Sequence, residues 1–169
     1  MRARTHEMRV TAAIPAVVLR ALTALIGIAG VISLNGYAPW QMIGAVAFVV
    51  GAVLPRSLAT WAGAAVIVLG IALDEPSPWR TALALLILHL VHVLGSVCMA
   101  VPFASRMHPR MLLPTLRRFV GVQLIAQPVA LLVVVMPTVG DDGVAWLAPV
   151  GGVIVAGLAV LLFRARTSQ

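Results

Sequence analysis

Charged residues are scarce in this sequence, and lysine is absent altogether. Only 10% of the 169 residues are charged and 62% are hydrophobic, whereas a soluble domain has roughly a quarter charged and half apolar residues. This composition is typical of an integral membrane protein. A membrane-crossing helix takes about 20 apolar residues, so five or six crossings use up the chain. We therefore expect a single transmembrane domain over residues 1–169, with no soluble domain.

Other absences exclude most kinds of chemistry. The single cysteine, Cys98, cannot form an intramolecular disulfide and is predicted to be a packed, inert thiol. The lack of lysine rules out Schiff-base catalysis, and the sequence has no phosphate-binding loop, no serine-nucleophile motif and no HExxH zinc motif. No carboxylate falls within an apolar stretch. The sequence therefore predicts no enzyme, no catalytic residue and no cofactor.

Six apolar stretches are separated by short segments that contain Pro, Gly, Arg or Asp. Each stretch predicts a transmembrane helix, and each short segment predicts a turn. The stretches are 10–34, 40–54, 57–73, 81–104, 119–137 and 144–163. The predicted fold is all-α: a polytopic integral membrane protein built as a six-helix transmembrane bundle with short loops.

The arginines predict how the chain is oriented, because Lys and Arg in short loops stay on the cytoplasmic side. With six crossings and a cytoplasmic N-terminus, only Arg80 falls outside. The other eleven are Arg2, Arg4, Arg9, Arg20, Arg56, Arg106, Arg110, Arg117, Arg118, Arg164 and Arg166. We therefore expect a multi-pass cell-membrane protein with both termini in the cytoplasm. The use of arginine alone, with many alanines and valines, is typical of a GC-rich bacterial genome.

Two stretches allow a different interpretation. The stretch 40–54 is short for a full crossing and could form a re-entrant hairpin with 57–73. Two crossings are favoured, because Arg56 at the tip of such a hairpin would lie in mid-membrane at a cost of several kcal/mol.

The stretch 10–34 also resembles a secretory signal, but Pro39 blocks cleavage at the obvious site. A retained helix is expected, with Arg20 reaching toward the cytoplasmic surface.

Small residues recur every four positions in the second and third stretches. Ala47 and Gly51 form one such pair, and Ala59 and Gly63 form another. This pattern lets helix backbones approach closely, as membrane helices do. It predicts close packing within the chain, and an oligomer could use the same surfaces.

Polar side chains interrupt the fourth and fifth stretches. His89, His92 and Ser96 share roughly one helix face, and Gln123 and Gln127 share a face of the next helix. If the two helices are antiparallel neighbours, these residues form a polar site inside the membrane. The favoured role is structural hydrogen bonding between helices, and proton relay is the alternative. No metal is predicted, because no third ligand lies in any stretch, and a haem would need one histidine from each of two helices.

Four of these arginines lie within or close to the sequence MHPRMLLP. They are Arg106, Arg110, Arg117 and Arg118. Such a cluster would attract anionic lipid headgroups or an acidic partner surface. The alternative is that it acts only as a topology signal.

Three functional hypotheses follow. The favoured one is a non-catalytic subunit or scaffold of a membrane or cell-envelope complex, which contacts lipid and a membrane protein partner or a second copy, but no nucleic acid. The second is a small-molecule transport component. In size and topology the chain is similar to the substrate-binding subunits of energy-coupling-factor transporters, and Ala12 and Ala16 resemble the small-residue contact on their first helix. The third is an intramembrane proton- or metal-handling protein centred on His89 and His92.

Overall fold

The computed structural model describes residues 13–75 and 77–135. It is 81% helical, which confirms the all-α class. The elements are β1 (Ile14–Pro15), α1 (Ala16–Leu34), α2 (Ala38–Val53), α3 (Ala59–Ala72), α4 (Pro78–Ala100), β2 (Arg106–Met107), the short 3₁₀ helix η1 (Pro109–Leu112) and α5 (Leu113–Val135). The first five predicted stretches each form a helix. The sixth, 144–163, lies outside the described residues, so the six-helix bundle is not confirmed.

Prolines explain where several helices begin and end. α1 begins only at Ala16, later than expected, because Pro15 is extended and belongs to β1. α4 begins at Pro78, where the missing N–H costs nothing. It ends at Ala100 rather than at 104, because Pro102 forces the residue before it out of the helical conformation. α5 begins at Leu113, six residues before the predicted stretch 119–137.

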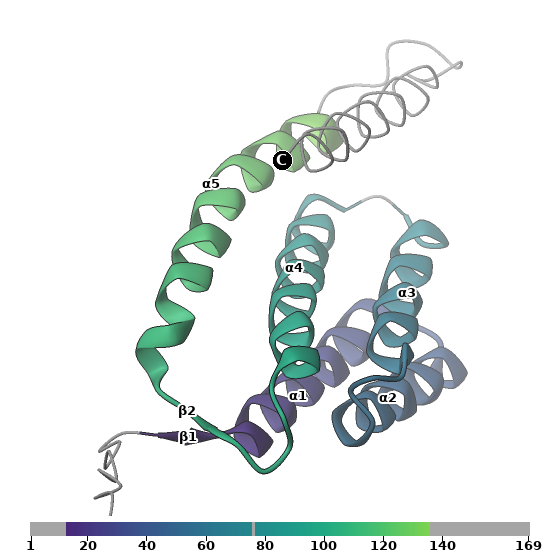
Figure 1. The fold of residues 1–169 in the computed structure, drawn as a ribbon. Helices are drawn as coiled ribbons and strands as arrows, with labels where there is room; N and C mark the ends of the chain where they lie inside the picture. The colour runs from purple at the N-terminus through teal and green to yellow at the C-terminus, as the bar shows by residue number, and fades with distance from the viewer. Residues whose placement is uncertain (1–12, 76, 136–169) are drawn as a thin grey trace, which may run out of the picture. The chain divides into compact units, whose positions relative to one another are not determined.

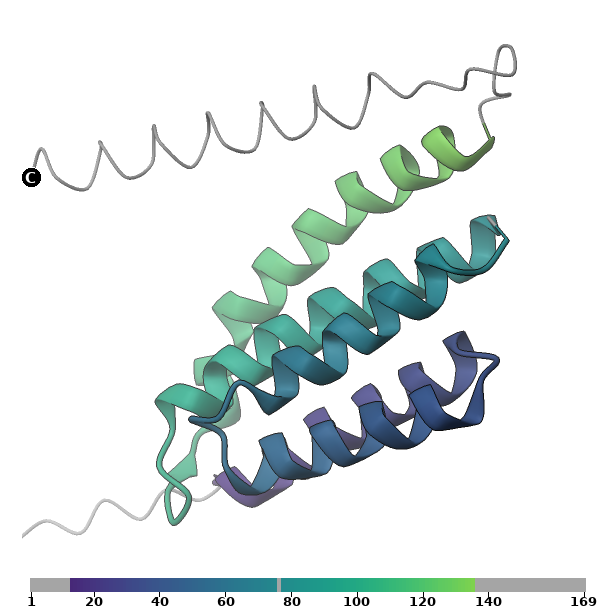
Figure 2. The same ribbon diagram turned by 90° about the vertical axis from the view of Figure 1, so that its right-hand side faces the viewer.

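The first four helices pack as antiparallel neighbours, and α5 packs against α4 (Figure 1). When the structure is turned, α1 and α2 form one row, α3 and α4 the next, and α5 lies beyond α4 (Figure 2). The two-residue strands β1 and β2 pair antiparallel and tie the start of α1 to the segment after α4. We call the end of the bundle where β1 and β2 lie the arginine end, because Arg20, Arg56, Arg106 and Arg110 lie there.

Glycines let the helices approach closely in the core. The Phe48 ring is buried between α1 and α3, at Gly27 and Gly63. A Cβ on Gly63 would lie 2.8 Å from the ring, and one on Gly27 would collide with it. Gly51 of α2 lies similarly close to the backbone of Thr60 in α3. These contacts confirm that small residues of the second and third stretches serve packing within the chain.

Two described helices are long and apolar enough to cross a membrane, namely α1 and α4. α2 and α3 are apolar but shorter, with 16 and 14 residues.

Candidate functional site

The predicted polar site assembles in part, between α4 and α5. The Gln123 side chain is buried, and its Nε2 lies 3.0 Å from Nδ1 of His89 and 3.4 Å from the carbonyl oxygen of Leu85. Gln127 Nε2 donates to Gln123 Oε1 at 2.9 Å and to the Ala82 carbonyl at 3.0 Å. The two glutamines therefore fasten α5 to α4 along two turns of helix, as antiparallel packing of the polar residues predicts.

His92 and Ser96 do not join this network. The exposed His92 ring packs edge-on against Trp61 of α3, with the ring centroids 4.9 Å apart. The ring of His89 instead lies 4.7 Å from that of Phe119 in α5. Ser96 Oγ donates to the backbone carbonyl of His92 at 2.7 Å. The single polar face expected for the histidines is therefore divided. Side chains three residues apart point about 60° apart around the helix, and α4 contacts α3 and α5 on different sides.

The chemistry open to this network is limited. Its members are one imidazole and two amides, and amides neither titrate near neutral pH nor hold transition metals well. Within residues 13–75 and 77–135, no three His, Cys, Asp or Glu side chains lie close enough to hold a metal ion. The geometry suits hydrogen bonding between helices better than group transfer.

The four clustered arginines all have exposed side chains. Arg106 lies in β2, Arg110 in η1, and Arg117 and Arg118 in the second turn of α5. η1 is capped by His108, whose Nδ1 accepts a hydrogen bond from the backbone N–H of Arg110 at 3.1 Å. The cluster therefore presents cations outward on an ordered turn.

Arg20 was expected to reach toward the cytoplasmic surface, and in the structure its side chain lies at the arginine end but is packed inside the bundle. Its side chain is only 5% exposed. Its Nη2 donates to the carbonyl oxygens of Cys98 at 3.3 Å and Val101 at 2.9 Å, and its guanidinium lies 5.1 Å from the centre of the Phe103 ring. The reason is local, because the last carbonyls of α4 offer acceptors within the bundle and carry partial negative charge.

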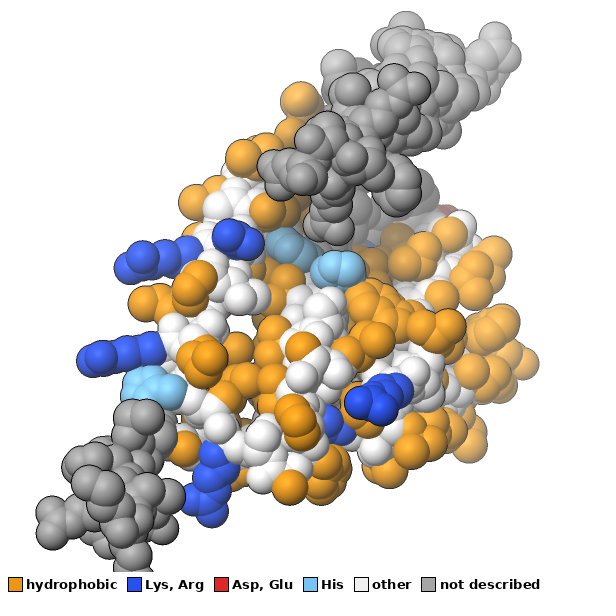
Figure 3. Space-filling view, in the orientation of Figure 1, with side chains coloured by type: hydrophobic (Ala, Val, Ile, Leu, Met, Phe, Trp, Pro, Cys, Tyr) orange, Lys and Arg blue, Asp and Glu red, His pale blue; other side chains and the backbone are white. Residues whose placement is uncertain are grey.

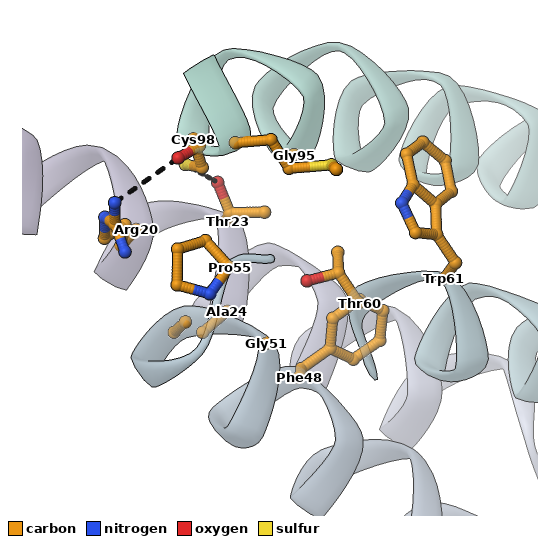
Figure 4. Close-up of a pocket in the computed structure, with 12 residues that line it drawn as sticks. Arg20, Thr23, Ala24, Phe48, Gly51, Pro55, Thr60, Trp61, Gly95 and Cys98 are labelled. Carbon is orange, nitrogen blue, oxygen red and sulfur yellow. Dashed lines mark hydrogen bonds between the residues drawn. The ribbon is translucent and has the colours of Figure 1, made fainter. Parts of the chain in front are cut away.

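Two cavities adjoin Arg20. The smaller one, about 10 Å³, lies between α1, α2, α3 and α4 and is shown in Figure 4, where Thr23 and Cys98 are seen beside Arg20. The larger is a cleft of about 680 Å³ at the arginine end, lined by Arg20, Arg56, Ser57 and mainly apolar residues. The sequence marked Arg20 as unusual, because it is a charged residue inside an apolar stretch. It did not show that the Arg20 side chain packs against the end of α4.

The opposite end of the bundle holds another arginine. Arg80 forms an ion pair with Asp74, and its Nη2 donates to the carbonyl oxygen of Leu34 at 2.7 Å. This is the one ion pair among the described residues. The hydrogen bond from Arg80 holds the pKa of the Asp74 carboxyl below its usual value, and a bond from the Glu75 N–H acts in the same direction. Arg80 thus links the end of α1 to the turn before α4.

Comparisons with protein-family models, curated proteins and solved structures found no match to this chain. The function is therefore inferred from the geometry of its own residues.

Proposed function

We propose that this chain is a multi-pass membrane protein that acts, without catalysis, as a subunit or scaffold of a membrane or cell-envelope complex. The observation that carries the proposal is the exposure of large hydrophobic side chains on every described α-helix. Met42 is 69% exposed, Leu124 71% and Ile125 72%. Hydrophobic side chains cover much of the face seen in Figure 3. Such a surface promotes aggregation in water, whereas lipid tails and partner helices match it.

The two longest apolar helices support the same conclusion. Only 39% of the most apolar window of α1 and 22% of that of α4 is buried within the chain. A core helix of a water-soluble protein with this composition would be mostly buried, since apolar side chains leave water when they can. The outward faces of α1 and α4 therefore favour a lipid or protein environment.

For topology, the proposal is six crossings with both termini in the cytoplasm. Arg20, Arg56, Arg106 and Arg110 lie at one end of the bundle and Arg80 at the other, the asymmetry that arginines adopt across a membrane. The loop around Arg56 lines the same cleft as the end of α4. This placement favours two crossings for α2 and α3 over a re-entrant hairpin, since the loop reaches the end of the bundle.

α2 is about 24 Å long at 1.5 Å per residue, against a hydrocarbon core of about 30 Å. Local thinning of the bilayer or packing against longer helices accommodates such a difference at modest cost. The short helices α2 and α3 are therefore compatible with crossing, and α1 lies beside both.

A non-catalytic role fits the polar site. His89 is engaged by Gln123, and Gln123 by Gln127, so the network holds α4 and α5 together. Partner contacts would come from the exposed helix faces and from the arginine cluster of residues 106–118, which suits anionic lipid headgroups.

A second candidate function is that of a small-molecule transport component. The observation that favours it is the cleft at the arginine end, whose volume of about 680 Å³ would hold a small organic molecule. The third hypothesis, proton or metal handling, loses support from the separation of the two histidines.

Membrane residence can be tested by fractionation of cells that express the chain. We expect the protein in the membrane pellet after washes with alkaline carbonate and with urea, and its release only by detergent. A stoichiometric protein partner that co-purifies in mild detergent would favour the subunit role. Release of the chain by carbonate alone would contradict the multi-pass proposal.

A further inference from the structure

Arg20 carries a buried charge that the protein only partly matches. Moving a charged group out of water costs several kcal/mol unless charges and hydrogen bonds replace the lost hydration. Both of its hydrogen bonds come from Nη2, and the buried Nε has no partner. Neither described carboxylate, Asp74 or Glu75, forms an ion pair with it. The guanidinium therefore retains both charge and donor capacity for a further acceptor.

Arg56 brings a second cation to the same place. It lies in the loop between α2 and α3 and lines the cleft together with Arg20 and the hydroxyl-bearing Ser57. The rest of the lining is apolar, with Val53, Leu54, Pro55, Met99, Ala100, Val101, Pro102 and Phe103. The cleft thus has a polar part that contains two guanidinium groups and an apolar wall that can contact hydrocarbon chains.

Helix ends do not reverse this positive charge. α1 and α3 begin at the arginine end with their positive poles, while α2 and α4 end there with their negative poles. The cleft lining includes the last residues of α2 and α4 but none from the first turns of α1 and α3, so two negative poles of about half a charge each offset part of the charge of Arg20 and Arg56. The two formal positive charges of Arg20 and Arg56 exceed these partial charges, so the cleft stays positive.

A purely structural role explains only part of this arrangement. As a clamp on the end of α4, Arg20 uses Nη2 alone, and a neutral donor could serve the same carbonyls. It leaves the buried Nε without a partner, and the topology rule that explains an arginine at this end does not explain why Arg56 lines the same cleft as Arg20. An acceptor with several oxygens in the cleft would meet both guanidinium groups that line it.

We propose that Arg20 and Arg56 form a binding site for a phosphate group. Guanidinium binds phosphate through paired N–H donors, and a tetrahedral oxyanion presents enough oxygens to accept from two arginines. The phosphate is carried by a lipid whose chains lie on the apolar wall, or it is free in solution. The lipid source rests on the proposed membrane location, whereas the free ion does not.

The test uses the full-length protein, purified and delipidated in an uncharged detergent. Its thermal unfolding is followed during titration with short-chain phosphatidylglycerol, with phosphatidylcholine of the same chain length, and with inorganic phosphate against chloride at equal ionic strength. A ligand of the folded state raises the unfolding temperature in a concentration-dependent way. We expect phosphatidylglycerol to raise it at concentrations where phosphatidylcholine does not, because the phosphate of phosphatidylcholine is already balanced by its own choline cation, which two arginines would repel. An equal effect of inorganic phosphate would identify the free ion as the source.

Two matched variants locate the site. Arg56→Gln should weaken the apparent affinity about tenfold, as loss of a charge-assisted hydrogen bond does. Arg110→Gln removes the same charge from the same end but outside the cleft, and it should weaken binding by less than about threefold. Arg20→Gln can also disturb the end of α4, so the substitution of the exposed Arg56 is the decisive one. Arg20→Lys keeps the positive charge and should retain part of the binding. Equal losses in Arg56→Gln and Arg110→Gln, or no response to any phosphate-bearing probe, would overturn the site even if the protein resides in the membrane.

Discussion

At the scale of single residues, the polar side chains of α4 and α5 pair with one another. His89, Gln123 and Gln127 form a chain that also reaches the carbonyls of Leu85 and Ala82. Each bond of this kind contributes about 0.6 kcal/mol on average in a membrane protein. These hydrogen bonds fix the register of α5 against α4 and add little to the free energy of folding.

The structural role of His89 predicts a mild effect for His89→Gln. Glutamine can still bond to Gln123, so the free energy of unfolding should fall by less than about 1 kcal/mol. Gln123→Leu should cost more, about 1–2 kcal/mol, because it leaves buried polar groups without partners. Unfolding in detergent, with His92→Gln as the control for an exposed imidazole, measures both. Loss of a bound metal or of pH-dependent transport in well-folded His89→Gln protein would restore the proton or metal hypothesis.

The Asp74–Arg80 pair predicts an acid-sensitive contribution to stability. The folded-state pKa of Asp74 lies below its ordinary value of 3.8, so the pair stabilises the fold above that pH. This stability is lost as pH falls through the lowered folded-state pKa, and the loss should be small because the carboxyl is exposed. Unfolding temperatures measured from pH 6 to pH 3 should decline less in Asp74→Asn than in the parent. An identical decline in Asp74→Asn and in the control Glu75→Gln would contradict this.

At the scale of helices, the glycines decide how closely α1, α2 and α3 approach. The Phe48 ring occupies the space that side chains at Gly27 and Gly63 would need. The four-residue spacing of small residues in the sequence predicted close packing, but not that Phe48 is its centre. The spacing of small residues shows which face of a helix can pack closely. It does not show which residue of a neighbouring helix packs against that face.

Gly63→Ala should therefore destabilise the bundle. Its new Cβ would press on the buried Phe48 ring, and overpacking of a core typically costs about 1–3 kcal/mol. Gly121→Ala in α5 is the matched control, because nothing lies within 4 Å of its Cβ position and alanine favours a helix by about 0.5–1 kcal/mol. Thermal unfolding of the two variants should move in opposite directions. A stabilised Gly63→Ala protein would show that α2 and α3 pack differently.

The arginine cluster of β2, η1 and the start of α5 makes a separate prediction. Replacing Arg106, Arg110, Arg117 and Arg118 with glutamine should weaken association with anionic vesicles, by roughly 1 kcal/mol per charge. The difference from the parent should shrink as salt rises, since such attraction is screened beyond a Debye length of about 10 Å at 0.1 M. Vesicle co-sedimentation of protein held in amphipol measures it. Unchanged binding would reduce the cluster to a topology signal.

At the scale of the whole molecule, the sequence predicted where the helices lie but not how single polar side chains pack between them. Apolar stretches located α1–α5 to within a few residues, except where Pro15 delayed α1 and where α5 began early at Leu113. Periodicity also predicted that the glutamine stripe lies near the histidine stripe if the two helices are antiparallel neighbours, and Gln123 and His89 are in contact. It could not place Arg20, because burial of its charge depends on the carbonyls at the end of α4, which lie 78 and 81 residues further along the chain. Nor could it separate His92 from His89, since that depends on which neighbours surround α4.

The central claim, a multi-pass protein whose arginine end faces the cytoplasm, is tested most directly by cysteine labelling in intact cells. In a Cys98→Ala background, Ala104→Cys lies at the arginine end and Gly36→Cys at the opposite end, and both positions are exposed. We predict that a membrane-impermeant maleimide labels Gly36→Cys in intact cells but labels Ala104→Cys only after permeabilisation. Labelling of both positions from outside, or of neither until the cells are opened, would contradict the account.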